Sequence, residues 1–550
     1  MSLMTLLASL MLDLPPALTH KIEYQIDLPV PMTDGTILLA NRIAPQGGEK
    51  LPIVLVRNPY TSRGKKPDLI SLLIAERGYQ VVIQNCRGTW GSGGVFRPFR
   101  DDREDGLATF KWLAEQTWFS GSVGMYGLSY WGYAQLAAGA GAPNFVKALA
   151  PQMAASRLYG VMYDHEILSL DGALTWNYQT YVSNAQESDK DKQRANKQRK
   201  GALSKGFMHL PVGEADRVAL KFTSPFFQDV LRYDRPDDEF WAAIDHSKRV
   251  DQIEAPVHFI DGWYDFFLAD MFADYASLCK AGKQPYLTIG PWTHAGTGAL
   301  KAGFKESFAW YDAYLRGNRA ALRSDPVRVF VMGINKWVNL PAWPPSSTAT
   351  GWYLQAGGKI STVAPVVETE PSRYRYDPAD PTPNVGGTVL FDGGPKDNRA
   401  LEARTDVLTF TSDAMSHNTT IMGQVSVDLY VRSSIEHTDF FARLCDVSRN
   451  GRTSINICDG IIRLKPQSQP AVKDGIRKVT IELLSTAHCF KTGHRIRLQV
   501  SSGAHPRYVR NLGTGEPAST DAMMQKADQE IFHDRTHRSV LILPIIPMPI

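Results

Sequence analysis

Residues 124–140 read GMYGLSYWGYAQLAAGA and decide the fold. A serine, Ser129, follows an apolar stretch of β type and precedes a run of small residues with helical character. The stretch nearly matches the Gly-x-Ser-x-Gly pattern of a nucleophile elbow, but its second glycine arrives one residue late, at Gly132. Such an elbow presents the serine hydroxyl at the C-terminal edge of a sheet, beside a helix N-terminus. An ordinary strand–turn–helix joint is the alternative interpretation of the same residues.

Apolar, β-branched stretches recur on both sides of Ser129 and predict the strands of one sheet. They lie at 51–60, 79–88, 121–129, 146–154, 254–265 and 283–294. The segment 101–116 has acidic residues at its start and apolar residues at helical spacing, which predicts a helix whose first turn suits the helix dipole. Buried strands that alternate with helices indicate a mostly parallel α/β sheet.

Two changes in the character of the sequence divide the chain. Residues 155–249 carry helical periodicity and no convincing strand, which predicts a helical cap inserted into the sheet domain and standing over its active edge. From about residue 350, period-2 alternation interrupted by turns predicts an antiparallel β-sandwich, of jelly-roll type. We therefore expect an α/β core in two parts, 20–154 and 250–345, and a sandwich at 346–550.

The charge balance argues against a nucleic-acid partner. The chain of 550 residues carries 60 Lys and Arg against 56 Asp and Glu, a net charge of +4, without a dominant basic stripe. The densest charged run, 187–200, contains both signs and is expected to be solvated. No window is long and apolar enough for a membrane span. The apolar N-terminus lacks the basic start of a signal peptide, so we expect a short surface helix and a cytoplasmic location.

Metal and cofactor sites are not expected either. Five scattered cysteines form no Cys-x-x-Cys pair, and no His, Asp or Glu cluster has metal-ligand spacing. The glycine-rich stretch RGTWGSGG, 87–94, lacks the pattern of a phosphate loop or a dinucleotide fingerprint, so we interpret it as structural. We therefore expect the cysteines to be free, mostly buried thiols and the active site to need no cofactor.

A serine nucleophile needs a base, and the base needs a residue that orients it. In hydrolases with this kind of elbow the order along the chain is Ser, then Asp or Glu, then His. Asp265 ends the expected strand 254–265 and His294 follows the strand 283–294, so both lie at the C-terminal edge of the sheet with Ser129. The backbone N–H of Tyr130 would then point at a developing oxyanion.

Other acids and histidines compete for these two roles. Asp261 sits nearer the strand body, and Asp270 falls inside the next expected helix. We expect His258, in the middle of a strand, to be a histidine of the core, and His505 to belong to the sandwich. Asp265 and His294 therefore remain the preferred pair.

At this point the residues resemble a known family, the cocaine esterase (CocE/NonD) serine hydrolases, which are related to X-Pro dipeptidyl-peptidases and α-amino-acid ester hydrolases. GMYGLSYWG is similar to the family's Gly-x-Ser-Tyr-x-Gly elbow, and GWYD and GPWTH resemble its Asp and His segments. VRNPY resembles its oxyanion loop, in which a tyrosine, here Tyr60, donates its hydroxyl beside the N–H of Tyr130. The likeness covers about residues 22–548 and implies an α/β-hydrolase core, a helical cap and a jelly roll.

The resemblance also implies an acyl pocket formed by Trp176, Phe267, Leu390 and Phe391, although each would suit an apolar core equally well. The expected partner is a small-molecule ester; no membrane or nucleic-acid partner is expected, and a homodimer remains possible. Because apolar residues follow Asp265, an uncharged acyl group fits better than an α-amino acyl group. An α-amino-acid ester hydrolase or β-lactam acylase, an X-Pro dipeptidyl-peptidase, and an inactive hydrolase-fold binding protein remain as alternatives.

Overall fold

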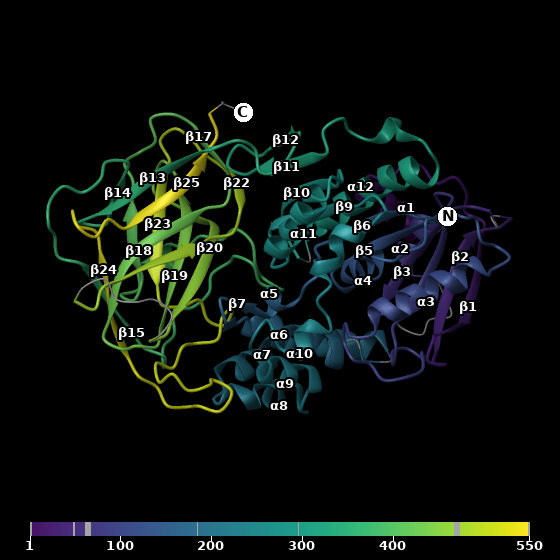
Figure 1. Cartoon of the computed structure of the whole chain (residues 1–550), viewed down its shortest axis with the longest axis horizontal. Helices are drawn as coiled ribbons and strands as arrows, with labels where there is room; N and C mark the ends of the chain where they lie inside the picture. Colours follow the sequence, from purple (N-terminus) through teal and green to yellow (C-terminus); the bar gives the residue numbers. More distant parts are fainter. Residues whose placement is uncertain are drawn as a thin grey trace.

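The computed structural model of the chain describes residues 3–47, 50–60, 68–183, 185–186, 188–294, 296–466 and 474–547. Figure 1 shows an α/β body built by the first half of the chain beside a β-rich body built by the C-terminal residues. A group of helices, α6 to α10, lies along one side of the α/β body and also approaches the β-rich body.

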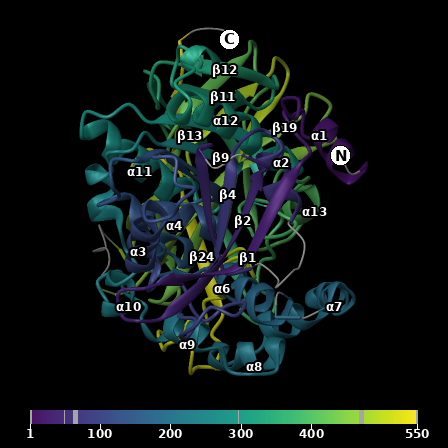
Figure 2. The same ribbon diagram turned by 90° about the vertical axis from the view of Figure 1, so that its right-hand side faces the viewer.

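The α/β body is organised on a ten-stranded sheet with the order β1-β2-β4-β3-β5-β6-β9-β10-β11-β12. Strands β3 to β11 pair in parallel, whereas β1, β2 and β12 are antiparallel additions at the two edges. Figure 2 shows β1, β2 and β4 side by side at one edge. The ten strands of this sheet are β1 Ile22–Pro31, β2 Ile37–Pro45, β3 Ile53–Asn58, β4 Gln80–Asn85, β5 Val123–Leu128, β6 Val146–Gln152, β9 His258–Tyr264, β10 Tyr286–Thr293, β11 Val327–Val331 and β12 Lys336–Leu340.

The six strands expected from the sequence are confirmed as β3, β4, β5, β6, β9 and β10, and the expected helix 101–116 is α3. Helices cover both faces of the sheet and bury two separate apolar layers. The first layer takes in α3, α4 and α11, and the second takes in α2 and α12. The bounds are α2 Leu69–Ala75, α3 Asp102–Ala114, α4 Tyr130–Gly139, α11 Leu268–Lys280 and α12 Thr297–Leu315. The apolar N-terminus forms a surface helix, α1 Leu3–Met11, as expected.

Residues 155–249 are mainly helical, with one difference from the sequence-based expectation. A short hairpin joins β7 Tyr163–Asp164 to β8 Ile167–Leu168. Its two-residue strands are too short to produce a visible period-2 pattern and could not be predicted from the sequence. The described part of the charged run lies at the start of α7, where most side chains are exposed, as expected. The helices are α5 Tyr159–Met162, α6 Leu170–Asn177, α7 Asp189–Met208, α8 Ala215–Leu220, α9 Pro225–Arg232 and α10 Glu239–Ala242.

The C-terminal residues build a second sheet of thirteen strands, which forms the expected sandwich. Its strands pair antiparallel, except for β14 and β16, which are parallel. Its inner positions are apolar and its outer positions polar, as in β18, where burial alternates along the strand. The backbone of Met332, after β11, exchanges hydrogen bonds with Ala487 and Cys489 of β22 and so joins the two bodies. The strands are β13 Thr348–Gln355, β14 Lys359–Ser361, β15 Ser372–Tyr376, β16 Leu408–Thr411, β17 Thr419–Gly423, β18 Ser426–Ser433, β19 Thr438–Val447, β20 Ser454–Leu464, β21 Arg477–Glu482, β22 Thr486–Phe490, β23 Arg495–Ser501, β24 Ala527–Phe532 and β25 Val540–Ile545, with one short helix, α13 Arg399–Glu402.

A buried group of charges fixes one loop of the sandwich. Asp459 on β20 contacts Arg443 at 3.0 Å and also pairs with Arg507, and all three side chains are buried. Burial raises the pKa of Asp459, but the charges of Arg507 and Arg443 outweigh it and hold that pKa below its usual value. Arg443 also donates to the backbone of Val385, at 2.7 Å, and to the side chains of Asn384 and Asn398. The group therefore anchors the base of the loop at 387–394, which is closed by reciprocal backbone hydrogen bonds between Gly387 and Gly394.

Removing the central negative charge should destabilise the protein and loosen this loop. Replacing Asp459→Asn would leave two buried guanidinium groups without a counter-charge, so we expect a loss on the order of 3 kcal/mol. The measurement is the midpoint of urea unfolding followed by tryptophan fluorescence. The matched control is Asp528→Asn, which breaks a pair with Arg375 whose side chains are 57% and 65% exposed, and should cost about 0.5 kcal/mol or less. Equal midpoints for the two variants would contradict the assignment.

Candidate functional site

Ser129 lies in a strained turn between β5 and α4. Its backbone has φ 58° and ψ −124°, a conformation that is costly for a residue with a side chain. The turn is held from the neighbouring strand, because the N–H of Ser129 donates to the carbonyl of Gln152 at 2.8 Å. The late glycine has a packing reason, since a Cβ on Gly132 would lie 2.5 Å from the Cβ of Ala154. The other glycine, Gly127, leaves room for the Trp131 side chain, which a Cβ there would meet at 2.3 Å.

Asp265 and His294 are brought together at the ends of β9 and β10. The imidazole Nδ1 lies 2.6 Å from one carboxylate oxygen of Asp265, and the N–H of Phe267 donates to the other oxygen at 2.8 Å. The two side chains are 0% and 5% exposed. With both of its oxygens engaged, the carboxylate holds the ring in one orientation.

Asp261, Asp270 and His258, which competed for these roles, have other partners. Asp261 accepts from the N–H of Gly262, and burial together with the nearby charge of Asp265 raises its pKa well above the usual value. Asp270 lies in α11, as expected, and pairs with Arg157. His258 lies in the sheet and contacts the hydroxyl of Thr288 at 3.0 Å. These contacts leave Asp265 as the carboxylate of His294.

Tyr60 follows β3 directly and faces the same site. The indole Nε1 of Trp176, on α6, donates to the Tyr60 hydroxyl at 2.9 Å. Burial raises the pKa of Tyr60 above its ordinary value, so the hydroxyl stays protonated and keeps its own hydrogen to donate.

Tyr130, the first residue of α4, points its side chain away from the turn. Its hydroxyl donates to Asp102 at 2.6 Å and accepts from the N–H of Phe99 at 2.9 Å. Its backbone N–H lies in the first turn of the helix, outside the ladder of helical hydrogen bonds. Asp102 in turn pairs with the buried Arg57 at 3.1 Å. The buried ring of Tyr130 thus anchors the start of α4 to α3.

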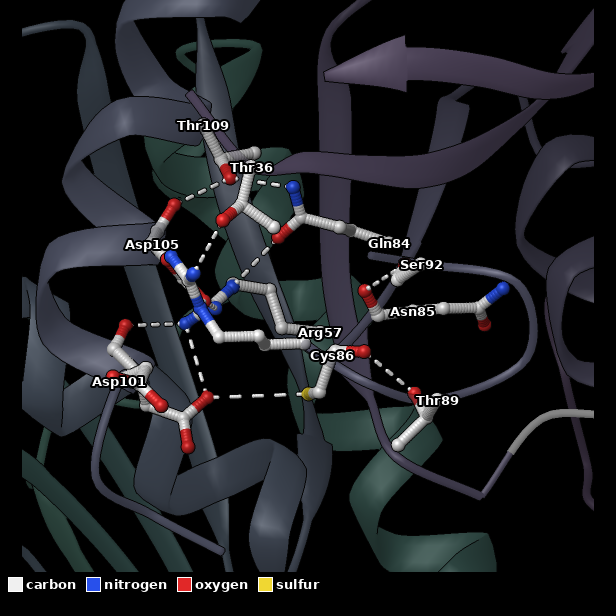
Figure 3. Close-up of polar contacts among 12 residues, drawn as sticks. Thr36, Arg57, Gln84, Asn85, Cys86, Thr89, Ser92, Asp101, Asp105 and Thr109 are labelled. Atoms are coloured by element: carbon white, nitrogen blue, oxygen red, sulfur yellow. Dashed lines mark hydrogen bonds and ion pairs between the residues drawn. The ribbon is translucent and has the colours of Figure 1, made fainter. Parts of the chain in front are cut away.

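Figure 3 shows the polar network behind this anchor. Arg57 donates to the side chain of Gln84 at 2.9 Å. Arg87 donates to the carboxylate of Asp105 and also to the side chains of Asp34 and Thr36. Arg87 opens the glycine-rich stretch 87–94. The close contacts of that stretch with the rest of the network agree with the structural role expected for it.

Two cavities meet at Ser129. The first runs toward the helical insertion and is almost wholly apolar; its lining includes Phe99, Leu158, Val161, Met162, Trp176, Phe266, Phe267 and Leu390. The second contains His294 and Tyr60, and its lining also includes Gln152, Gln179, Leu300, Leu390 and Phe391. The four residues expected around the acyl group thus all border the site, Trp176 and Leu390 in both cavities.

Several lining residues were missed by the sequence analysis. The ring of Phe266 stacks on His294 with centroids 4.4 Å apart, and Phe99 stacks on Tyr130 at the same centroid distance. Leu158, Val161 and Met162 come from the start of the helical insertion. The only signal for Phe266 was its place next to Asp265, and nothing in the linear sequence indicated Phe99.

Within the described residues, no three His, Cys, Asp or Glu side chains come together in a way that could hold a metal ion. All five cysteines are free, four of them buried and Cys279 exposed. Among the helices in the described ranges, none combines the length and the hydropathy that a bilayer crossing requires.

Comparisons with known proteins identify the family. The profile of X-Pro dipeptidyl-peptidase (S15 family) matches residues 34–296, and that of the X-Pro dipeptidyl-peptidase C-terminal non-catalytic domain matches residues 318–542. A cocaine esterase from Rhodococcus sp. (strain MB1 Bresler) is 33% identical over 567 residues, which span 94% of this chain and 97% of that protein. The chain belongs to the cocaine esterase (CocE/NonD) family. It is therefore a hydrolase of the serine esterase and S15 peptidase type.

Other similar proteins match most of the chain, and two solved structures share its fold. A protein named as a putative serine esterase from Mycobacterium bovis is 24% identical, covering 85% of this chain and 83% of its own. An α-amino acid ester hydrolase structure superimposes with a TM-score of 0.81 at 24% identity, covering 97% of this chain and 98% of its own. An aminopeptidase structure from a marine sediment archaeon gives a TM-score of 0.82 at 22% identity, covering 97% of each chain. These structures confirm the α/β-hydrolase core with its C-terminal β-rich body.

Proposed function

We propose that this protein hydrolyses carboxylic esters through an acyl-enzyme formed on Ser129. The observation that carries the proposal is the 2.6 Å contact between Asp265 and His294, whose ring borders the same cavity as the strained Ser129. His294 takes the proton of the Ser129 hydroxyl while the Ser129 oxygen attacks the ester carbonyl carbon. The C–O bond to the alcohol then breaks, and His294 returns the proton to the leaving oxygen. Water, activated by the same imidazole, releases the acid and restores the serine.

The negatively charged oxygen of the tetrahedral intermediate needs hydrogen-bond donors that stabilise its charge. We assign this role to the Tyr60 hydroxyl and the backbone N–H of Tyr130. The donation from Trp176 occupies a lone pair of the Tyr60 oxygen at 2.9 Å, which leaves the hydroxyl hydrogen for the substrate. The N–H at the start of α4 adds the positive end of the helix dipole.

Replacing Ser129→Ala should abolish ester hydrolysis without unfolding the protein. The change removes the attacking oxygen and leaves the turn intact. We expect less than about 1% of wild-type turnover of p-nitrophenyl esters, since the nucleophile and its base act as one unit. Wild-type protein should also be labelled by a fluorophosphonate probe, and the variant should not. Retention of more than a few per cent of activity with an unchanged melting curve would move the nucleophile elsewhere. Absence of wild-type labelling would favour the inactive binding protein.

Replacing Tyr60→Phe tests the hydroxyl as an oxyanion donor. We expect kcat to fall by about 10²–10³ with a small change in KM, because the hydroxyl acts on charge that appears only in the transition state. Steady-state kinetics with one p-nitrophenyl ester would show the split between kcat and KM. An unchanged kcat in a correctly folded variant would remove Tyr60 from the oxyanion hole.

The apolar cavity favours neutral acyl groups over α-amino acyl groups. An ammonium group placed there would lose its hydration without gaining a counter-charge, since Phe266 and Phe267 border the cavity where a pairing acid would be needed. Two acids of the helical insertion have partners elsewhere: Asp164 accepts from the Tyr508 hydroxyl at 2.6 Å, and Glu166 pairs with Lys465.

The third acid of residues 163–172, Asp171, is a rival anchor for an ammonium group. It is partly buried next to Gly172, which lines the apolar cavity, and the burial of its carboxyl raises its pKa to about 6. Its oxygens already accept from the N–H of Leu390 at 3.3 Å and from the Thr175 hydroxyl at 3.2 Å. We therefore assign it to holding Leu390 in place.

A substrate pair that differs only in the amino group measures this preference. We expect kcat/KM for a phenylacetyl ester to exceed that for the matched phenylglycine ester by at least tenfold, equivalent to about 1.4 kcal/mol. Asp171→Asn should leave the ratio unchanged. A tenfold preference for the phenylglycine ester, lost in Asp171→Asn, would instead favour α-amino-acid ester hydrolysis with Asp171 as its anchor.

A further inference from the structure

The two oxyanion donors come from different parts of the core, and their separation has to be fixed by something between them. Tyr60 follows β3, and Tyr130 follows β5. The parallel ladder between these strands runs from Ile53 opposite Val123 only as far as Leu55 opposite Met125. Toward the site, therefore, the sheet ladder does not tie the ends of the two strands to each other.

Asn58, the last residue of β3, spans this gap. Its side-chain oxygen accepts the backbone N–H of Tyr60 at 2.7 Å and the indole Nε1 of Trp131 at 2.8 Å. Asn58 is 6% exposed, so its side-chain oxygen is buried where the two hydrogen bonds meet. One carbonyl oxygen, with its two lone pairs, thus accepts from both sides of the oxyanion hole.

Trp131 transmits this contact to Tyr130. It is the next residue in α4, and its side chain packs onto Gly127 at the other end of the turn. Trp131 is therefore fixed both to the elbow and to Asn58. On the other side, the Trp90 indole donates to the carbonyl of Pro59 at 3.0 Å and holds the link between Asn58 and Tyr60.

We propose that Asn58 is a positioning residue, which sets the distance between the Tyr60 hydroxyl and the Tyr130 N–H. The inference rests on the proposed function and adds to it a residue that touches neither the substrate nor the nucleophile. Donors aimed at an oxyanion lose most of their effect when displaced by about 1 Å. Loss of Asn58 therefore weakens both donors without removing either.

Two substitutions test the proposal from the two ends of the contact. Asn58→Ala removes the shared acceptor, and we expect kcat to fall 10- to 100-fold with KM within about threefold of wild type. Trp131→Phe keeps an aromatic ring over Gly127 and removes only the indole N–H, and we expect kcat to fall about fivefold or more. Gln80→Ala is the matched control, because it removes a buried amide side chain at the opposite end of the β3–β4 ladder, where Gln80 contacts Arg42 and Leu51.

A double-mutant cycle separates positioning from general stability. If Asn58 aligns the Tyr60 hydroxyl, the fold loss of kcat caused by Tyr60→Phe is at least five times smaller in the Asn58→Ala background than in wild type. Fully multiplicative losses, or a kcat for Asn58→Ala equal to that of Gln80→Ala, would overturn the proposal. If Asn58→Ala does not fold, Trp131→Phe decides, and an unchanged kcat there rejects the inference. Full activity of Ser129→Ala would instead refute the underlying mechanism, whatever the Asn58 variants do.

Discussion

The strained backbone of Ser129 is the constraint on which the rest of the site depends. A non-glycine residue at φ 58° and ψ −124° costs on the order of 1–3 kcal/mol and persists only where its surroundings impose it. Here β6 holds the turn through the carbonyl of Gln152, and Gly132 allows α4 to pack against Ala154. Strand, turn and helix therefore act as one rigid unit, and the serine, the N–H of Tyr130 and Trp131 all take their places from it.

The remaining parts of the chain complete the walls around this unit. The core supplies His294 and Tyr60, the helical insertion supplies Trp176, and a sandwich loop supplies Leu390 and Phe391. Direct contacts cross these boundaries. Asp171 of α6 accepts from the N–H of Leu390, and Arg199 of α7 lies 3.7 Å from the ring centroid of Phe391. The cleft at Ser129, made of the two cavities, is thus formed jointly by three segments that are distant in sequence.

Much of this arrangement could be predicted from the sequence because it follows from strand ends. Ser129, Asp265 and His294 each follow a buried strand, and parallel strands end at one edge. Tyr60, Trp176, Leu390 and Phe391 came only from the family resemblance, since no periodicity marks them. The stacking of Phe266 on His294 and the bridge formed by Asn58 could not be predicted at all. They depend on side-chain packing between elements, which a single sequence does not encode in any local pattern.

The loop of residues 387–394 has a consequence for how such an enzyme diversifies. Its base is locked by Arg443, Asp459 and Arg507, deep in a sandwich that contributes no reacting group. Its tip carries Leu390 and Phe391, which border the cleft. Residues at the tip can therefore be exchanged while the chemistry stays protected on another part of the chain. Under the proposed mechanism, exchanges at the tip of this loop would alter substrate choice and leave the reacting groups in place.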